Sequence, residues 1–155
     1  MELVIWDSRY ITGIELIDNQ HKQLVDLTNN LYTACLGGNE ELPDLFRDAM
    51  HHMVEYVQHH FNTELELLKQ INYPDYHNHK VMHNTLVNDI ISSANDFKEG
   101  KHFVPNHFVR TLKDWIFGHI AVNDKDYALF VKDQIRTGLL TEQKLHDIGQ
   151  AISGK

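Results

Sequence analysis

The sequence has one cysteine, three prolines and few basic residues. The lone Cys35 excludes a disulfide within the chain and is typical of a reducing compartment. Lys and Arg number 14 against 22 Asp and Glu, and the resulting net charge of −8 argues against nucleic-acid binding. There is no signal-peptide pattern at the N-terminus, and no apolar run approaches the ~20 residues of a membrane span. We therefore expect a soluble, cytoplasmic protein with no nucleic-acid partner and no membrane span.

Four long helical patterns, separated by helix-breaking residues, make up most of the chain. We expect helices over residues 17–36, 42–71, 75–98 and 105–122. Asp18 is a plausible N-cap of the first, and Gly37-Gly38, residues 72–74 and Gly100 are the breaks. Because short connections make consecutive helices antiparallel neighbours, the sequence predicts an all-α, up-down-up-down antiparallel four-helix bundle.

A length of 155 residues suits one domain with its own core. We expect residues 1–155 to form a single domain, with an N-terminal arm over 1–16, the bundle over 17–124 and a helical tail over 125–155. Residues 124–136 and 141–152 are expected to form short helices, the second with Leu145, Ile148 and Ile152 on one face. Packing is the favoured role of this tail, and partner binding is the alternative.

The core-facing positions follow the a and d phase of left-handed bundle packing. They are Ile17, His21, Leu24, Thr28, Leu31 and Cys35 in the first helix, Met53, Val57, His60, Glu64, Leu67 and Ile71 in the second, His79, His83, Leu86, Ile90, Ser93 and Phe97 in the third, and Phe108, Leu112, Trp115, His119 and Val122 in the fourth. Histidines and acids on such a stripe need a partner, because a buried polar group without one is costly.

Seven metal-ligand-type residues lie in this buried phase or directly after it: His21, His60, Glu64, His79, His83, His119 and Asp124. His60 and Glu64 are four residues apart, as are His79 and His83, a spacing that places both members on one helix face. His119 and Asp124 are five apart and converge only if the α-helix ends or distorts between them. We therefore predict a break near residues 121–123.

Metal binding explains these seven residues better than packing does. Five buried histidines could each hydrogen-bond to a carbonyl or carboxylate, but so many in phase on four helices favour coordination. Imidazole and carboxylate ligands without thiolate suit iron, zinc or manganese. Seven ligands exceed the needs of one tetrahedral zinc and suit two ions about 3.5–4 Å apart.

The spaced motif resembles the hemerythrin family, and in particular the single-domain bacterial hemerythrins. The matching stretches are IDNQHKQL (17–24), HFNTE (60–64), HKVMH (79–83) and WIFGHIAVNDK (115–125), and the match covers roughly residues 6–132. The resemblance implies one iron held by His79, His83 and His119, and a second held by His21 and His60. It also implies bridges from Glu64, Asp124 and an oxo or hydroxo group, with dioxygen binding at an open position on the two-histidine iron.

That resemblance implies reversible oxygen transport, storage or delivery without catalysis. Dioxygen is then the ligand, small anions such as azide are further ligands, and an oxygen-consuming protein is a possible recipient. A di-iron oxidase or peroxidase is one alternative, although the repeated Glu-x-x-His motif of ferritin-like proteins is missing. An oxygen or redox sensor is the other, with the C-terminal tail as the one candidate for output.

We expect an apolar oxygen pocket made by Leu24, Phe61 and Trp115, residues that would also serve as ordinary core. Ala121 stands where the family usually carries a larger aliphatic residue. A smaller side chain could widen the pocket, and we therefore expect faster autoxidation or readier anion entry. His51, Glu55 and His59 also recur at four-residue steps, but we place them on a solvated face.

Overall fold

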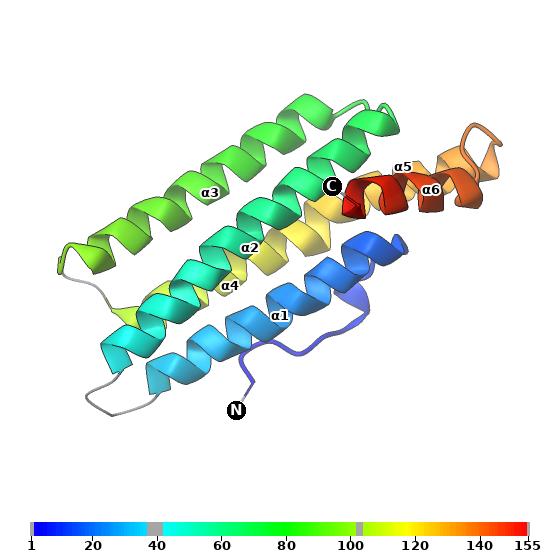
Figure 1. Ribbon diagram of the computed structural model, residues 1–155. Helices are drawn as coiled ribbons and strands as arrows, with labels where there is room; N and C mark the ends of the chain where they lie inside the picture. Colours follow the sequence, from blue (N-terminus) through cyan, green and yellow to red (C-terminus); the bar gives the residue numbers. More distant parts are fainter. Residues whose placement is uncertain (1, 37–41, 102–103, 155) are drawn as a thin grey trace.

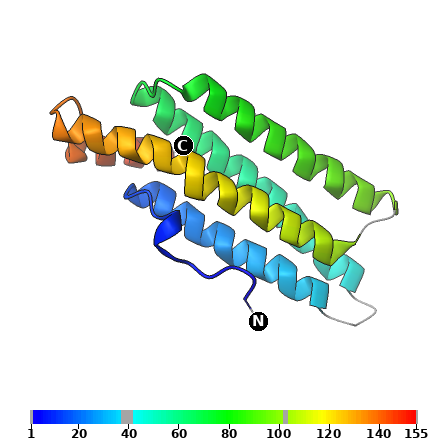
Figure 2. The same ribbon diagram turned by 180° about the vertical axis from the view of Figure 1, so that it is seen from behind.

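The computed structural model describes residues 2–36, 42–101 and 104–154 of the chain. Its long helices are α1 (Glu15–Leu36), α2 (Leu42–Gln70), α3 (Tyr76–Lys98) and α4 (Pro105–His119). They run side by side along one axis, each antiparallel to the one before it in the chain (Figures 1 and 2). The predicted all-α antiparallel bundle is confirmed. No helix among the described residues is long and apolar enough to cross a membrane.

The N-terminal arm runs extended along α1 and α4 and contains one 3₁₀ turn, η1 (Ser8–Tyr10). α1 begins at Glu15, two residues earlier than predicted, so Asp18 lies inside the helix and is not its N-cap. The Asp18 carboxylate instead accepts hydrogen bonds from the backbone N–H groups of Thr12 and Gly13 in the arm. The predicted break at Gly37-Gly38 lies outside the described residues.

The turn between α2 and α3 follows from local backbone chemistry. Asn72 adopts a left-handed φ of 54°, a conformation that asparagine tolerates better than most residues. The backbone N–H of Tyr73 then donates to the carbonyl of Leu68, which satisfies one of the last carbonyls of α2. α3 starts at Tyr76, one residue later than predicted, with Asp75 as its N-cap.

A π-helical turn, η2 (Ile120–Asp124), joins α4 to α5 (Lys125–Arg136). The α-helix does end before residues 121–123, but the chain stays helical, so the predicted break is a change of helix type. The expected core phase of the fourth helix is wrong at two positions, since Trp115 is 37% exposed and Val122 is 62% exposed. Buried apolar residues recur instead at steps of four: Phe108, Leu112, Ile116 and Ile120.

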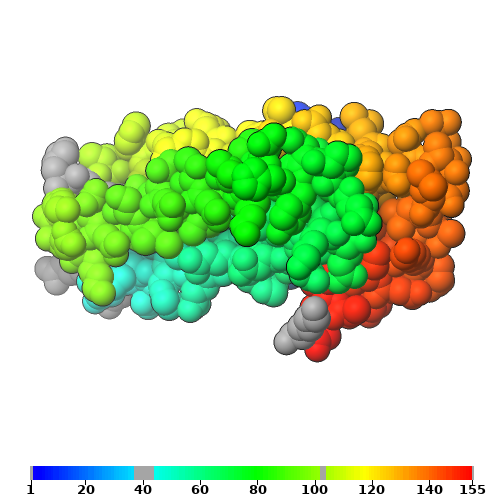
Figure 3. Space-filling model, turned by 90° about the horizontal axis from the view of Figure 1, so that it is seen from above, coloured from blue at the N-terminus to red at the C-terminus, as the bar shows by residue number. Residues whose placement is uncertain are grey.

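Two hydrophobic clusters fill the interior. The larger one lies between the four long helices and the arm, and it includes Leu24, Met53 and Leu112. The smaller one lies at the other end, where α5 and α6 (Glu142–Ser153) close the bundle, and it includes Ile17, Leu67 and Tyr127. Figure 3 shows α3 along one face of the molecule and this C-terminal segment at its end. Both predicted tail helices are therefore present, and Ile148 and Ile152 of α6 are buried.

Candidate metal centre

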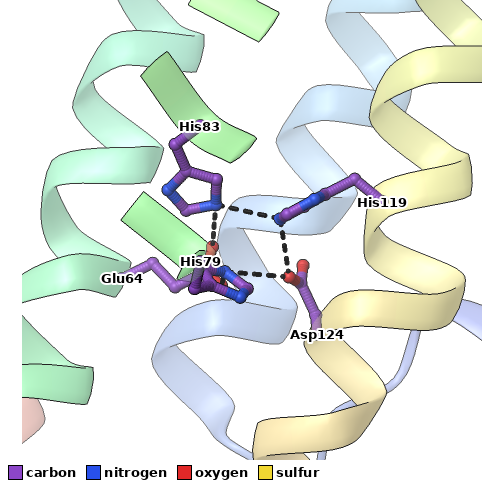
Figure 4. A group of neighbouring side chains, drawn as sticks. All are labelled: Glu64, His79, His83, His119 and Asp124. Carbon is purple, nitrogen blue, oxygen red and sulfur yellow. Dashed lines mark hydrogen bonds and ion pairs between the residues drawn. The ribbon is translucent and has the colours of Figure 1, made fainter. Parts of the chain in front are cut away.

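The four long helices and the π turn bring all seven predicted ligand-type residues into one buried cluster. His21 comes from α1, His60 and Glu64 from α2, His79 and His83 from α3, His119 from the last residue of α4 and Asp124 from η2. His119 is the most exposed of them, at 9%. Figure 4 shows five of these side chains, with three imidazoles and two carboxylates directed toward one another.

The cluster consists of two overlapping groups that share both acids. One group contains His79, His83 and His119 with Glu64 and Asp124, and the other contains His21 and His60 with the same two acids. The potential ligand atoms in each group lie within 4.8 Å of one another. Two carboxylates shared by two histidine groups suit a pair of bridged metal ions.

Interatomic distances show how the shared acids link the two groups. Glu64 Oε1 lies 2.8 Å from His79 Nε2, and Glu64 Oε2 lies 3.3 Å from His60 Nε2. Asp124 Oδ1 lies 3.1 Å from His119 Nε2, and Asp124 Oδ2 lies 3.3 Å from His21 Nε2. Each carboxylate therefore has one oxygen close to the three-histidine group and the other close to the two-histidine group, and Glu64 Oε2 also lies 3.7 Å from His83 Nε2.

Several of these atoms are buried without a hydrogen-bond partner. They are His21 Nε2, His60 Nε2, Glu64 Oε2 and both carboxylate oxygens of Asp124. They approach one another closely but lack hydrogen-bond geometry, so they converge on the space between them. Unpaired buried acceptors are costly, and a cation in that space satisfies them directly. The residues present therefore fit a metal centre.

Hydrogen bonds outside the cluster fix the rings of two histidines. His21 Nδ1 lies 3.1 Å from the carbonyl oxygen of Tyr10, and His60 Nδ1 lies 2.9 Å from Oε1 of Gln20. Because both partners accept hydrogen bonds, both Nδ1 atoms carry the proton. The Nε2 lone pairs are then left for the centre, which is the usual outer support of a metal-binding histidine.

The two acids differ in their electrostatic surroundings when no cation is bound. Burial and the charge of Asp124 raise the pKa of Glu64. Burial opposes ionisation of Asp124 as well, but His119 and His21 outweigh it and hold the pKa of Asp124 well below its usual value. Without a cation, Asp124 holds its negative charge more firmly than Glu64, and a dication favours ionisation of both.

The histidines also differ from one another in the direction in which their pKa values are shifted. Burial and the neighbouring His119 lower the pKa of His83 to about 2, and burial with His21 lowers the pKa of His60 well below its ordinary value. Burial alone would also lower the pKa of His119 and His21, but the charge of Asp124 raises both. A neutral imidazole is the form that binds a metal ion, so His60 and His83 need no deprotonation to do so.

The π turn explains how residues five apart meet. In a π-helix the hydrogen bond joins residues i and i+5, so one extra residue fits into the turn. His119 and Asp124 therefore lie on one face, whereas they would be about 140° apart on an α-helix. Single π turns inside α-helices are frequent at functional sites.

The four residues expected around the oxygen site lie in different surroundings. Leu24 and Phe61 are buried, and the Phe61 ring stacks on His83 with centroids 3.7 Å apart. Trp115 is exposed to solvent, so its predicted place in the pocket is wrong, because the buried stripe of α4 passes through Ile116 instead. Ala121 lies in the π turn, packs against the larger hydrophobic cluster and lines a groove of about 640 Å³ between the arm and α4.

Three residues near the cluster were missed by the sequence analysis. Gln20 is buried one residue before His21, but it lies outside the core positions predicted for this helix, and its place next to a candidate ligand was the one signal available. The Tyr10 carbonyl left no signal, because any residue supplies one. Tyr127 has a fully buried hydroxyl, and burial together with Glu64 raises its pKa well above the ordinary value.

The chain is similar to a family of cation-binding domains, to curated proteins and to a solved structure. Residues 12–130 match the model of the Hemerythrin HHE cation binding domain. A bacteriohemerythrin of Stenotrophomonas maltophilia is 26% identical over 96% of this chain and 92% of its own length. A bacteriohemerythrin of Methylococcus capsulatus is 30% identical over 83% of this chain and 96% of its own length. A crystal structure of wild-type hemerythrin superposes with a TM-score of 0.75 at 28% identity, covering 81% of this chain and 95% of that one.

Proposed function

The chain belongs to the hemerythrin HHE cation-binding family, and from that membership we propose that it binds dioxygen reversibly at a centre of two iron ions. In this proposal His79, His83 and His119 would hold one ion, His21 and His60 would hold the other, and Glu64 and Asp124 would be ligands of both. The bound iron pair would supply the electrons and the open coordination position that dioxygen needs.

The asymmetry of the two histidine groups is the observation that carries the proposal. One group has three imidazoles and the other has two, while both share the same two carboxylates. The ion beside His21 and His60 therefore has one protein ligand fewer, so an exogenous ligand would bind there. A pair of structural ions would not need this difference.

The other residues around the site support binding in a dry, fixed environment. Tyr10 and Gln20 hold the protons of His21 and His60 on the outer ring nitrogens, away from the centre. Leu24 is fully buried one helical turn after His21, and it helps to exclude water from the two-histidine side. Exclusion of water and protons slows the loss of a reduced oxygen species, which favours reversible binding over oxidation chemistry.

A binding role agrees with the names of the relatives, which are bacteriohemerythrins. We propose that the protein carries, stores or delivers oxygen without catalytic turnover. The class of recipient that fits this role is an oxygen-consuming protein.

The deciding experiment is an optical spectrum of the anaerobically reduced, iron-loaded protein before oxygen, after oxygen and after its removal. A visible charge-transfer band that appears with oxygen and disappears on deoxygenation is expected. Irreversible conversion to a ferric spectrum would overturn reversible binding and favour an oxidase or redox sensor. Tight binding of a different metal, with no iron-dependent spectrum, would overturn the di-iron assignment itself.

A further inference from the structure

The N-terminal arm contacts the cluster through its backbone. The carbonyl oxygen of Tyr10 accepts the hydrogen bond of His21 Nδ1, in the segment that contains the η1 turn. A backbone carbonyl is always an acceptor, so this hydrogen bond depends on where the carbonyl is held. The orientation of the His21 ring therefore depends on how firmly residues 8–13 are held against the bundle.

Lys125 holds one side of that segment. Its Nζ donates to the carbonyl of Ser8 at 3.1 Å and also to the carbonyl of Ile11. These two carbonyls lie on either side of residues 9 and 10, so one ammonium group fixes the stretch that presents the Tyr10 carbonyl. An ammonium group has three donors and no acceptor, which suits it to bind two carbonyl oxygens at once.

Asp18 holds the other side of the same segment. Its carboxylate accepts from the N–H of Thr12 at 2.7 Å, from the N–H of Gly13 at 3.0 Å and from the Thr12 hydroxyl at 2.8 Å. A cation thus binds the carbonyls of the arm and an anion binds its N–H groups. Lys125 and Asp18 thus hydrogen-bond to the two ends of this backbone segment.

The position of Lys125 in the chain completes a closed series of contacts that passes through His21 and Asp124. Lys125 directly follows Asp124, whose carboxylate lies 3.3 Å from His21 Nε2. From His21 the contacts pass through Nδ1 to the Tyr10 carbonyl, then along the arm to Ser8 and Ile11, and back to Lys125. The η1 turn also packs against the π turn that contains Asp124.

We propose that Lys125 is a positioning residue for the metal centre: it locks the N-terminal arm so that the Tyr10 carbonyl fixes the ring and the proton of His21. This inference rests on the proposed metal centre, because it assigns His21 Nε2 to a bound ion. Lys125 does not touch His21 and acts only through the arm. Without the lock, the His21 ring is free to turn or to move its proton to Nε2, and either change removes a ligand from the two-histidine side.

The test compares Lys125→Met with Lys132→Met in the iron-loaded protein. Methionine keeps most of the length of the side chain and removes its donors. Lys132 lies on the same helix, is exposed and makes no hydrogen bond to the described residues of the arm, so its substitution matches the loss of charge without removing a hydrogen bond from the arm. Two quantities are measured: deuterium uptake of the peptide over residues 2–14, and the rate at which a chelator removes the metal. Asp18→Asn tests the opposite end of the segment with the same two measurements.

For Lys125→Met we expect faster deuterium uptake in the arm and metal loss about three- to tenfold faster than in the wild type, since loss of outer support for a ligand weakens metal binding. Lys132→Met should behave like the wild type, and Asp18→Asn should shift both quantities in the same direction as Lys125→Met. An unchanged rate of metal loss in Lys125→Met overturns the proposal, even if the arm exchanges faster. Because the rate of metal loss does not depend on oxygen binding, failure of reversible oxygenation would leave this result interpretable.

Discussion

Gln20 and His60, forty positions apart, are joined by a hydrogen bond of 2.9 Å between Oε1 of the amide and Nδ1 of the imidazole. The orientation of the amide is fixed, because Gln20 Nε2 donates to the Thr63 hydroxyl at 3.3 Å. That hydroxyl in turn donates to the carbonyl of His59 and has a lone pair free to accept. Gln20 can therefore offer only its oxygen to His60, which keeps the imidazole proton on Nδ1.

This relationship predicts that Gln20→Leu weakens metal binding on the two-histidine side. Loss of the acceptor leaves a buried imidazole N–H without a partner, and such substitutions typically cost about 10- to 100-fold in metal affinity. Metal content and the rate of metal release measure the effect. Gln20→Glu retains an acceptor oxygen and should lie between Gln20→Leu and the wild type.

Gln23→Leu is the matched control, because Gln23 is exposed on the same helix three residues later. It should leave metal release unchanged. If Gln20→Leu and Gln23→Leu release metal at the same rate, Gln20 does not position His60.

Ala121 gives a second prediction. It lies in the π turn between His119 and Asp124 and lines the groove between the arm and α4, so a larger side chain there fills part of that groove. We expect Ala121→Leu to autoxidise more slowly and to bind azide more slowly than the wild type. Ala151→Leu, an exposed change of the same size on α6, is the control. Equal rates in the wild type and Ala121→Leu would show that this position does not limit access.

The core phase of four helices, together with the spacing of acids and imidazoles within them, was enough to predict which residues form the cluster. His60 with Glu64, and His79 with His83, share a helix face because they are four residues apart. The five-residue step from His119 to Asp124 even predicted a distortion of the helix. For residues of one helix, the number of positions between them is enough to predict whether they share a face.

Contacts between distant segments were not predictable in this way. Neither the bond from Gln20 to His60 nor the one from Lys125 to the arm follows from any local pattern, because each joins elements that meet only in the folded bundle. Trp115 was misplaced because the predicted heptad phase steps by three residues from Leu112 to Trp115. The buried stripe of α4 steps by four, from Leu112 to Ile116. Asp18 was misread as a helix cap because its true partners, the N–H groups of residues 12 and 13, belong to a non-helical arm.

The C-terminal tail gives a third prediction, which separates packing from partner binding. Ile148 and Ile152 are buried in the smaller hydrophobic cluster, away from the seven ligand-type residues. Ile148→Ala should lower the free energy of unfolding by about 2–5 kcal/mol, the usual cost of such a core truncation. The exposed His146→Ala is its control, and the spectrum of the metal-loaded protein should be unchanged in both. An unaltered unfolding midpoint in Ile148→Ala would contradict a packing role for the tail.

Cys35 gives the fourth prediction, on pH. Burial raises the pKa of its thiol from 9.0 to about 11, and the thiol also donates to the carbonyl of Leu31 at 3.2 Å. This rise in pKa lowers the thiolate fraction at pH 8 about 100-fold. Alkylation of the folded protein at pH 8 should therefore be slower than in denaturant by at least this order.

The raised pKa of Cys35 means that the folded state holds more protons than the unfolded state between pH 9 and 11. The free energy of unfolding should therefore fall as pH rises through this window, and the contribution of Cys35 is fully present only below about pH 9. Cys35→Ala should flatten the fall between pH 8.5 and about 10.5 relative to the wild type, as measured by urea unfolding at each pH. Parallel curves for the two proteins would show that the Cys35 thiol titrates alike in both states.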